Sequence, residues 1–190
     1  MKKVFVTIVL IFVCFFMVKA QQYLEKETKF NVRTNVGYST YATSYKGMFM
    51  SIDYCLPILS KINLVNSFTM SYGKEEAIIF RSNYHFIGWG IGPELSIKLF
   101  RISQLEFKPA FATSWMMMSE TLGQMFRDDG MAYPVVSDHS FYSIGYTVTL
   151  AYRVFIKKNI SIGVLAGITS VSKKKKSLKT IGLSCQFDLN

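Results

Sequence analysis

Hydrophobic and polar positions alternate with a period of two residues along most of this chain. In the segment 104–116, Phe107 and Phe111 fall on one side, whereas Glu106 and Lys108 fall on the other. Because successive side chains of a β-strand point to opposite faces, the pattern predicts ribbons with one apolar face and one small or charged face. In a soluble barrel the apolar face points inward, whereas in an outer-membrane barrel it points outward to lipid.

This alternation predicts eight strands, each long enough to cross a bilayer, which takes about 9–11 tilted residues. The strands cover residues 29–41, 46–56, 62–72, 84–99, 104–116, 140–155, 160–171 and 178–189. The connections after the second, fourth and sixth strands are short, whereas those at 73–83 and 117–139 are long. Short turns at one end and long loops at the other are typical of outer-membrane barrels. We therefore predict an all-β fold, an eight-stranded antiparallel up-and-down transmembrane barrel.

The predicted outward faces carry no Lys, Arg, Asp or Glu, as expected where each such charge costs about 2–4 kcal/mol in lipid. The predicted interior has equal numbers of cations and anions, and such a barrel is too narrow for an aqueous channel. Because buried charges are costly unless they are paired, we expect a filled interior with a charge network, including pairs across the turn 100–103. A catalytic carboxylate or a proton path is the alternative. The network residues are Arg33, Asp53, Glu94, Lys98, Glu106, Lys108, Arg153 and Asp188.

The first 20 residues have the layout of a secretory signal peptide. Lys2 and Lys3 precede an almost unbroken apolar run from Val4 to Val18, and Ala20 offers a small residue for cleavage. The apolar run is shorter than the ~20 residues of a membrane-spanning helix, which disfavours an uncleaved anchor. We expect a signal peptide at 1–20, a short periplasmic segment at 21–28 and a barrel domain at 29–190.

The chain after residue 20 resembles the small eight-stranded bacterial outer-membrane β-barrel family. The resemblance is carried by the signal-like segment, by the stretch Gly-Trp-Gly-Ile-Gly-Pro-Glu-Leu at 88–95, and by the aromatic-rich final hairpin. Barrels of this family often end on an aromatic residue, whereas here Phe187 lies three residues before the end. The resemblance implies a location in the bacterial outer membrane and contact with its lipid and lipopolysaccharide. It does not imply one particular activity.

Two predicted loops carry residues suited to contact with other molecules. An exposed group of methionine and aromatic side chains can form a contact surface, and clustered lysines attract phosphates or another anionic partner. The alternative is that both are simply solvated loops. The candidate contacts are Met125, Phe126, Arg127 and Tyr133 in the connection 117–139, and Lys173, Lys174, Lys175 and Lys176 before the last strand.

The sequence offers little for catalysis or for cofactor binding. Asp138, His139 and Ser140 have the residue types of a hydrolase triad, but neighbours in a strand point apart. Cys55 and Cys185 are predicted on opposite faces, and no His or Cys spacing matches a metal site. We therefore expect no disulfide between them and no metal or other cofactor.

The combined prediction is a monomeric, non-enzymatic outer-membrane barrel that presents extracellular loops for adhesion, envelope integrity or partner binding, without an open pore. Nucleic acid is not an expected partner, because no basic patch interleaved with aromatic residues is present. The alternatives are an outer-membrane enzyme that hydrolyses acyl chains of lipid A, a small pore, and a soluble lipocalin-like carrier.

Overall fold

The computed structural model describes residues 30–42, 44–59, 61–76, 81–126, 132–157, 159–171 and 176–189. Within these ranges, no helix has both the length and the hydropathy of a membrane-spanning segment. The predicted signal peptide at 1–20 and the segment 21–28 lie outside the described residues. The strands are β1 (Phe30–Tyr41), β2 (Tyr45–Leu59), β3 (Ile62–Glu76), β4 (Arg81–Phe100), β5 (Ser103–Phe126), β6 (Ala132–Lys157), β7 (Ile160–Val171) and β8 (Lys176–Leu189).

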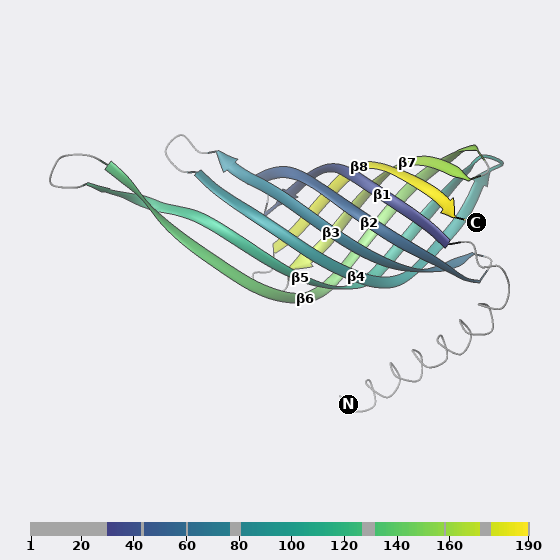
Figure 1. The fold of residues 1–190 in the computed structure, drawn as a ribbon, viewed down its shortest axis with the longest axis horizontal. Coiled ribbons are helices and arrows are strands. Elements are labelled where there is room, and N and C mark those ends of the chain that lie inside the picture. The colour runs from purple at the N-terminus through teal and green to yellow at the C-terminus, as the bar shows by residue number, and fades with distance from the viewer. Residues whose placement is uncertain are drawn as a thin grey trace, which may run out of the picture.

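Each strand pairs antiparallel with its neighbour in sequence, and β1 pairs with β8 to close the sheet into a barrel. Figure 1 shows the strands winding obliquely around the barrel, with the end of β8 far from the tip of the β5–β6 hairpin. The eight predicted strands are thus confirmed in number, order and direction. Closure removes the free edges that an open sheet would present.

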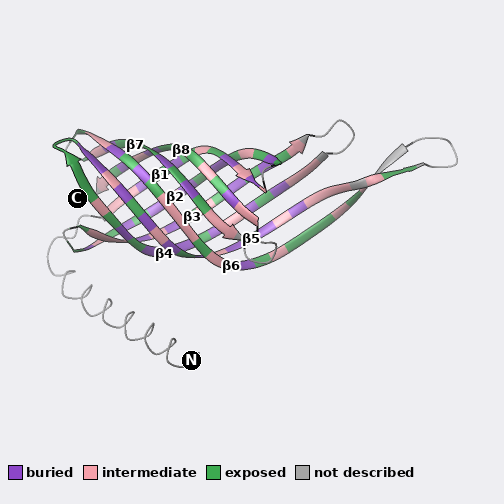
Figure 2. Ribbon diagram, turned by 180° about the vertical axis from the view of Figure 1, so that it is seen from behind, coloured by how far each residue is buried: buried purple, intermediate pink, exposed green. Residues whose placement is uncertain are grey.

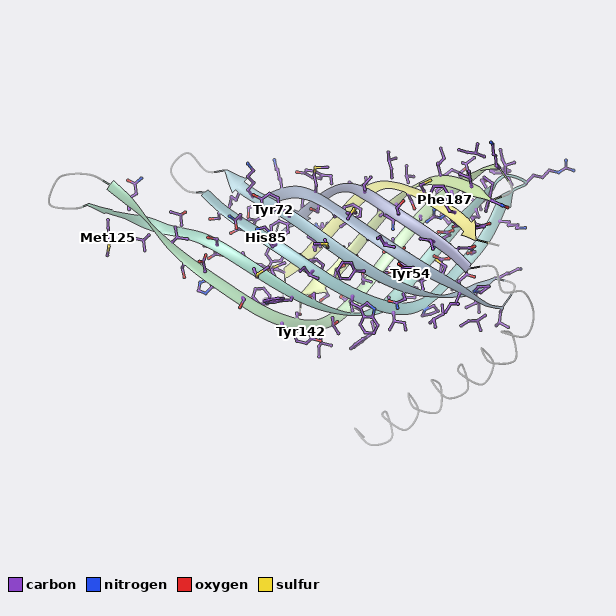
Figure 3. The ribbon with its side chains drawn as sticks, in the orientation of Figure 1. Tyr54, Tyr72, His85, Met125, Tyr142 and Phe187 are labelled. Carbon is purple, nitrogen blue, oxygen red and sulfur yellow. The ribbon has the colours of Figure 1, made fainter. Side chains whose placement is uncertain are left out.

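The alternation of side chains places apolar groups on the outside of the barrel. Trp89, Phe111 and Tyr146 are 46%, 55% and 60% exposed, respectively. Buried and exposed residues follow each other along the strands in Figure 2, and Figure 3 shows side chains projecting outward from the barrel wall. Asn66 occupies an outward position within this surface, where its amide oxygen accepts a hydrogen bond from the Trp89 indole. The observed orientation is the one expected for a barrel surrounded by lipid.

Glycines let neighbouring strands curve closely together on the inside of the barrel. Gly37 on β1 is paired with Gly182 on β8, and Gly47 on β2 is paired with Gly73 on β3. A Cβ atom at Gly37 would collide with the backbone of Ile181 and Gly182. These positions therefore accept only glycine without a shift of the strands, as expected where a narrow barrel bends sharply.

The β5–β6 hairpin continues well beyond the rest of the barrel. β5 and β6 contain 24 and 26 residues, and their pairing extends to Phe126 opposite Ala132. The predicted loop at 117–139 is therefore wrong over most of its length, as is the loop at 73–83, which β3 and β4 shorten from both sides. Outside the lipid both faces of a strand meet water, so a strand there needs no alternation of apolar and polar residues.

Candidate functional site: the barrel interior and the protruding hairpin

Arg33 on β1 lies in the barrel interior, where it is 1% exposed. Its guanidinium donates to both carboxylate oxygens of Glu94 on β4, with Nη2 2.9 Å from Oε1. Nη1 also lies 3.3 Å from Oε2 of Glu106 on β5, and Nε donates to Oε1 of Gln186 on β8 at 2.7 Å. Because the planar fork of arginine matches carboxylate geometry, this one side chain ties four strands together.

Glu106 joins a second arginine to the same network. Arg153 on β6 donates from Nε to Oε2 of Glu106 at 2.7 Å, while Gln104 donates to Oε1 of the same carboxylate. On the opposite side of the network, Asn63 Nδ2 donates to Oε1 of Glu94 at 2.9 Å. All four carboxylate oxygens of the two glutamates thus have donors, which offsets the cost of burying their charges.

Lys108 on β5 and Asp53 on β2 form a second buried ion pair. Lys108 Nζ lies 2.7 Å from Asp53 Oδ2 and also donates to Ser67 Oγ at 3.1 Å. Lys108 is 8% exposed and Asp53 is 3% exposed. Ser67 thus gives the ammonium group a second acceptor. The ion pair lies beside the Arg33 network and has this hydrogen bond in addition to the contact between its own charges.

The buried network is electrically balanced and leaves little space. It comprises the cations Arg33, Lys108 and Arg153 and the anions Asp53, Glu94 and Glu106, each less than 9% exposed. These six residues line a cavity of about 10 Å³, which is roughly the space of one water molecule. Asp53 Oδ1 and Arg153 Nη1 have no hydrogen-bond partner within the described protein. The cavity suits a bound water better than the passage of ions or solutes.

Two of the predicted network residues lie away from this centre. Lys98 is on an inward-facing row of β4, but it is exposed at the barrel rim. Asp188 on β8 is partly buried and accepts a hydrogen bond from Gln186 Nε2 at 2.8 Å. The expected pairing around the turn 100–103 is also wrong, because Glu94, Glu106 and Lys108 each pair with strands other than β4 and β5. Arg33 and Asp53 reach these residues across the narrow interior, whereas Arg153 lies on the neighbouring strand β6. Strand alternation reveals neither arrangement.

Four neutral side chains in these contacts were not predicted from the sequence. They are Asn63, Ser67, Gln104 and Gln186. Ser67 and Gln186 already stood on predicted small faces, so their inward position was readable from alternation. Their specific partners were not, because the partner of Gln186 depends on the register of β1 against β8 and Ser67 meets Lys108 from β5, which is not its neighbour.

A cluster of buried apolar side chains fills the interior on the hairpin side of the ion pairs. Its centre is aromatic, with the Tyr41 and Tyr84 rings 5.6 Å apart and the Tyr45 and Tyr84 rings in edge contact at 5.9 Å. Lys176 Nζ lies 5.7 Å from the centre of the Tyr41 ring. This apolar cap was not predicted from the sequence. An indication of it was present, because large apolar residues near position 86 stand on the predicted inward face of their strand. Its members are Tyr41, Tyr45, Tyr84, Phe86, Met116, Met118 and Leu178.

The structure places some of the predicted loop contacts on strands instead. Met125 lies near the tip of the β5–β6 hairpin, is 68% exposed and is labelled in Figure 3. The backbones of Phe126 and Tyr133 belong to β5 and β6, and Lys176 begins β8. Arg127 and residues 173–175 lie outside the described residues. Among the predicted contacts in the connection 117–139, Met125 is therefore the one whose backbone and side chain are both described near the end of the hairpin.

Comparisons with known proteins identify the architecture. No protein-family model matches the chain, and no curated protein matches it. Among solved structures, it is similar to Neisserial surface protein A, with a TM-score of 0.58, 14% identity, and coverage of 84% of this chain and 97% of that one. It is also similar to Ail, the attachment invasion locus protein of Yersinia pestis, with a TM-score of 0.54, 10% identity, and coverage of 86% and 99%. The fold is that of the small bacterial outer-membrane β-barrels.

A second structure of Ail from Yersinia pestis, in complex with the heparin analogue sucrose octasulfate, matches with a TM-score of 0.56 and 9% identity, covering 86% of this chain and 99% of that one. At these identities the likeness concerns the fold. An outer-membrane barrel also explains the polar interior and apolar exterior, an arrangement opposite to that of a soluble lipocalin.

The residues considered for chemistry do not form a complete site in the described structure. His139 Nε2 lies 3.0 Å from Ser137 Oγ on the exposed part of β6, whereas Asp138 points to the other face because it lies between them. Cys55 is buried and Cys185 is partly buried, and both are free. Within the described residues, no group of three or more His, Cys, Asp or Glu side chains is arranged to hold a metal ion.

Proposed function

We propose that this protein is a non-enzymatic, monomeric barrel of the bacterial outer membrane that holds its β5–β6 hairpin outside the cell as a contact surface. Residues 1–20 act as the cleaved export signal. The observation that carries the proposal is the free edge of this hairpin. β6 pairs with β5 from Ala132 onward, but it pairs with β7 only from Thr147 onward. Among the described strands, residues 132–140 thus have no ladder partner on that side.

A free strand edge is a surface for recognition. Its unpaired backbone N–H and C=O groups can bind an extended segment of another protein. Exposed side chains of the hairpin add further contact area. One of them is Met125 on the paired strand β5, which is 68% exposed. The hairpin therefore supports a role in adhesion or partner binding more directly than a role in maintaining the envelope.

The orientation of the barrel supports placement of this hairpin outside the cell. The connections after β2, β4 and β6 are short and lie at the end where β8 finishes, opposite the hairpin tip (Figure 1). In barrels of the outer membrane the short turns face the periplasm and the longer extensions face outward. The outward apolar surface supports the proposal that lipid surrounds the barrel wall, with lipopolysaccharide as its neighbour in the outer leaflet.

The interior supports a scaffold instead of a pore. The balanced ion pairs leave a cavity of about 10 Å³, and the apolar cap of seven side chains lies between them and the hairpin end. Side chains thus fill the barrel, as is usual for eight strands.

Labelling of single cysteines tests the orientation. Cys55 and Cys185 are first replaced by serine, and Met125→Cys is compared with Lys61→Cys at the opposite rim. A membrane-impermeant maleimide applied to intact cells should label the Met125→Cys protein, and should label the Lys61→Cys protein only after the cells are permeabilised. Labelling with the two positions exchanged would refute the proposed orientation.

Shortening the hairpin tests its role. Ser119 and Asp138 are directly opposite in the ladder, so an Asn-Gly turn can join them and remove residues 120–137 while keeping the register. Cells with the full-length protein should attach to wells coated with heat-unfolded matrix protein, which offers extended segments, more strongly than cells with the shortened protein. Lys61→Gln at the opposite rim serves as the control and should leave attachment unchanged. Equal attachment by full-length and shortened proteins at equal surface levels would contradict the proposal.

A further inference from the structure

Three exposed lysines lie in one row on the outside of the barrel near its hairpin end. Lys46 on β2 is directly opposite Lys74 on β3. Thr40 on β1 is opposite Lys46 on one side and opposite Lys179 on β8 on the other. All three lysines are exposed. They form a basic row across β8, β1, β2 and β3, which sequence alternation along single strands did not reveal.

The basic row begins where the apolar surface ends. Two positions further along each strand toward the opposite rim, the outward residues are Met48, Tyr72 and Ile181, which are 71%, 45% and 61% exposed. The Tyr72 ring also packs against the ring of His85 on β4 at 4.8 Å, a pair labelled in Figure 3. Tyrosine at this boundary is typical of membrane interfaces, and lysine stems extend over apolar surface while their ammonium groups reach the polar layer.

The charges do not continue around the barrel. Beyond Lys74 the same register row contains Asn83 on β4, Ser119 on β5 and Asp138 on β6. The row therefore changes from basic to neutral and then to acidic. A general attraction to the membrane would not need this one-sided arrangement, whereas a bound anionic headgroup would.

The spacing of the lysines suits phosphate groups. Adjacent strands are about 4.8 Å apart, so Lys46 and Lys74 are immediate neighbours, and Lys179 lies two strands from Lys46. Because the two lysines are directly opposite each other, one phosphate group can lie within reach of both ammonium groups. Thr40 stands between Lys46 and Lys179, and its hydroxyl is a further donor for the same headgroup.

We propose that Lys46, Lys74 and Lys179 form a binding site for the phosphate groups of a glycolipid of the lipid A type in the outer leaflet. This inference rests on the proposed orientation, in which the hairpin end faces outward. It assigns the lipid contact to the barrel wall, separately from the loop lysines at 173–176 that the sequence suggested.

The test measures binding of diphosphoryl lipid A to the full-length protein in non-ionic detergent by native mass spectrometry. Each change of one of these lysines to glutamine should weaken binding about fivefold, and the triple variant about 100-fold, since a lysine near an anionic lipid surface contributes about 1 kcal/mol. A matched control changes Lys61, Lys98 and Lys157 to glutamine, three lysines exposed at the opposite rim. This control should change lipid A binding less than about twofold. Heat-modifiable gel mobility confirms that both triple variants are folded.

Dephosphorylated lipid A should bind the unaltered protein as weakly as diphosphoryl lipid A binds the K46Q/K74Q/K179Q variant. Equal losses in the two triple variants would overturn the site, and phosphatidylglycerol binding as tightly as lipid A would overturn its assignment to a glycolipid. Binding in micelles does not depend on orientation in the cell. Failure of this site therefore differs from failure of the proposed function, which cysteine labelling and the shortened hairpin test.

Discussion

The Lys108–Asp53 pair allows a quantitative test of the filled interior. Asp53→Asn keeps the size of the side chain but removes the charge that lies 2.7 Å from Lys108 Nζ. Lys108 would then keep only neutral acceptors, which are the amide oxygen of the new side chain and Ser67 Oγ, 3.1 Å away. Leaving one buried charge without its partner costs about 3–5 kcal/mol. We expect Asp53→Asn to lower the free energy of unfolding by that amount, and Lys108→Met to lower it by a similar amount.

The double variant D53N/K108M separates the pair interaction from the loss of either residue alone. Because replacing a complete buried ion pair is often nearly neutral, we expect the double variant to lie within about 1–2 kcal/mol of the unaltered protein. The free energy of unfolding is measured with urea in phospholipid vesicles, by tryptophan fluorescence and by heat-modifiable mobility. Lys98→Met changes an exposed lysine on an inward-facing row of β4. It should lower the free energy of unfolding by less than about 0.5 kcal/mol. Single losses below 1 kcal/mol that simply add in the double variant would refute a coupled buried pair.

Three further predictions follow from the barrel. Val148→Arg on the outward face should impair membrane insertion by about 2–4 kcal/mol, whereas Thr147→Ser, which keeps a hydroxyl for Thr169, should insert normally; equal heat-modifiable mobility would contradict this. The purified protein should give no steady single-channel conductance in planar bilayers, and regular current steps would refute the filled interior. Mass spectrometry of lipid A should find the same acyl pattern with His139→Ala as with the unaltered protein and with a deletion strain, whereas an altered pattern would favour the enzyme alternative.

The part of the fold inside the membrane was predictable because lipid imposes one simple rule on each strand. β7 begins and ends where the alternation from Ile160 to Val171 does. β1 ends at the predicted Tyr41 and is described from Phe30, and the other six strands extend the predicted segments at one end or both. The outward direction of Trp89 and Phe111 follows from the same rule. Alternation tells which face a side chain occupies, because the faces of a strand meet different solvents.

The same rule fails where the solvent no longer differs between faces. From Glu120 to Phe126 β5 continues beyond its pairing with β4 and is paired with β6, and its apolar and polar residues do not alternate regularly there. The inward apolar side chains of Tyr84 and Met116 are a second departure, because they pack on each other instead of facing lipid. In both places a partner strand or a neighbouring ring decides the structure, and neither is visible along one strand.

The partners of the interior charges were beyond sequence reasoning for a geometrical reason. Arg33 and Glu94 are separated by 61 positions, on strands β1 and β4 that are not hydrogen-bonded neighbours. They meet because long side chains from different sides of a narrow barrel reach its axis. Strand alternation gives the face, whereas the tilt and closure of the whole sheet give the partner.

The charge balance of the interior indicates where the activity of this protein lies. The chain has 22 Lys and Arg against 12 Asp and Glu, yet the buried network has equal numbers of cations and anions. Neutrality inside follows from the high cost of unpaired charge in a low dielectric, so the positive excess lies outside the network. There, exposed lysines such as Lys46 and Lys74 stand at the boundary of the apolar surface. A filled, neutral interior suits a rigid support, and this agrees with the proposals that assign binding to the basic row and to the free edge of the hairpin.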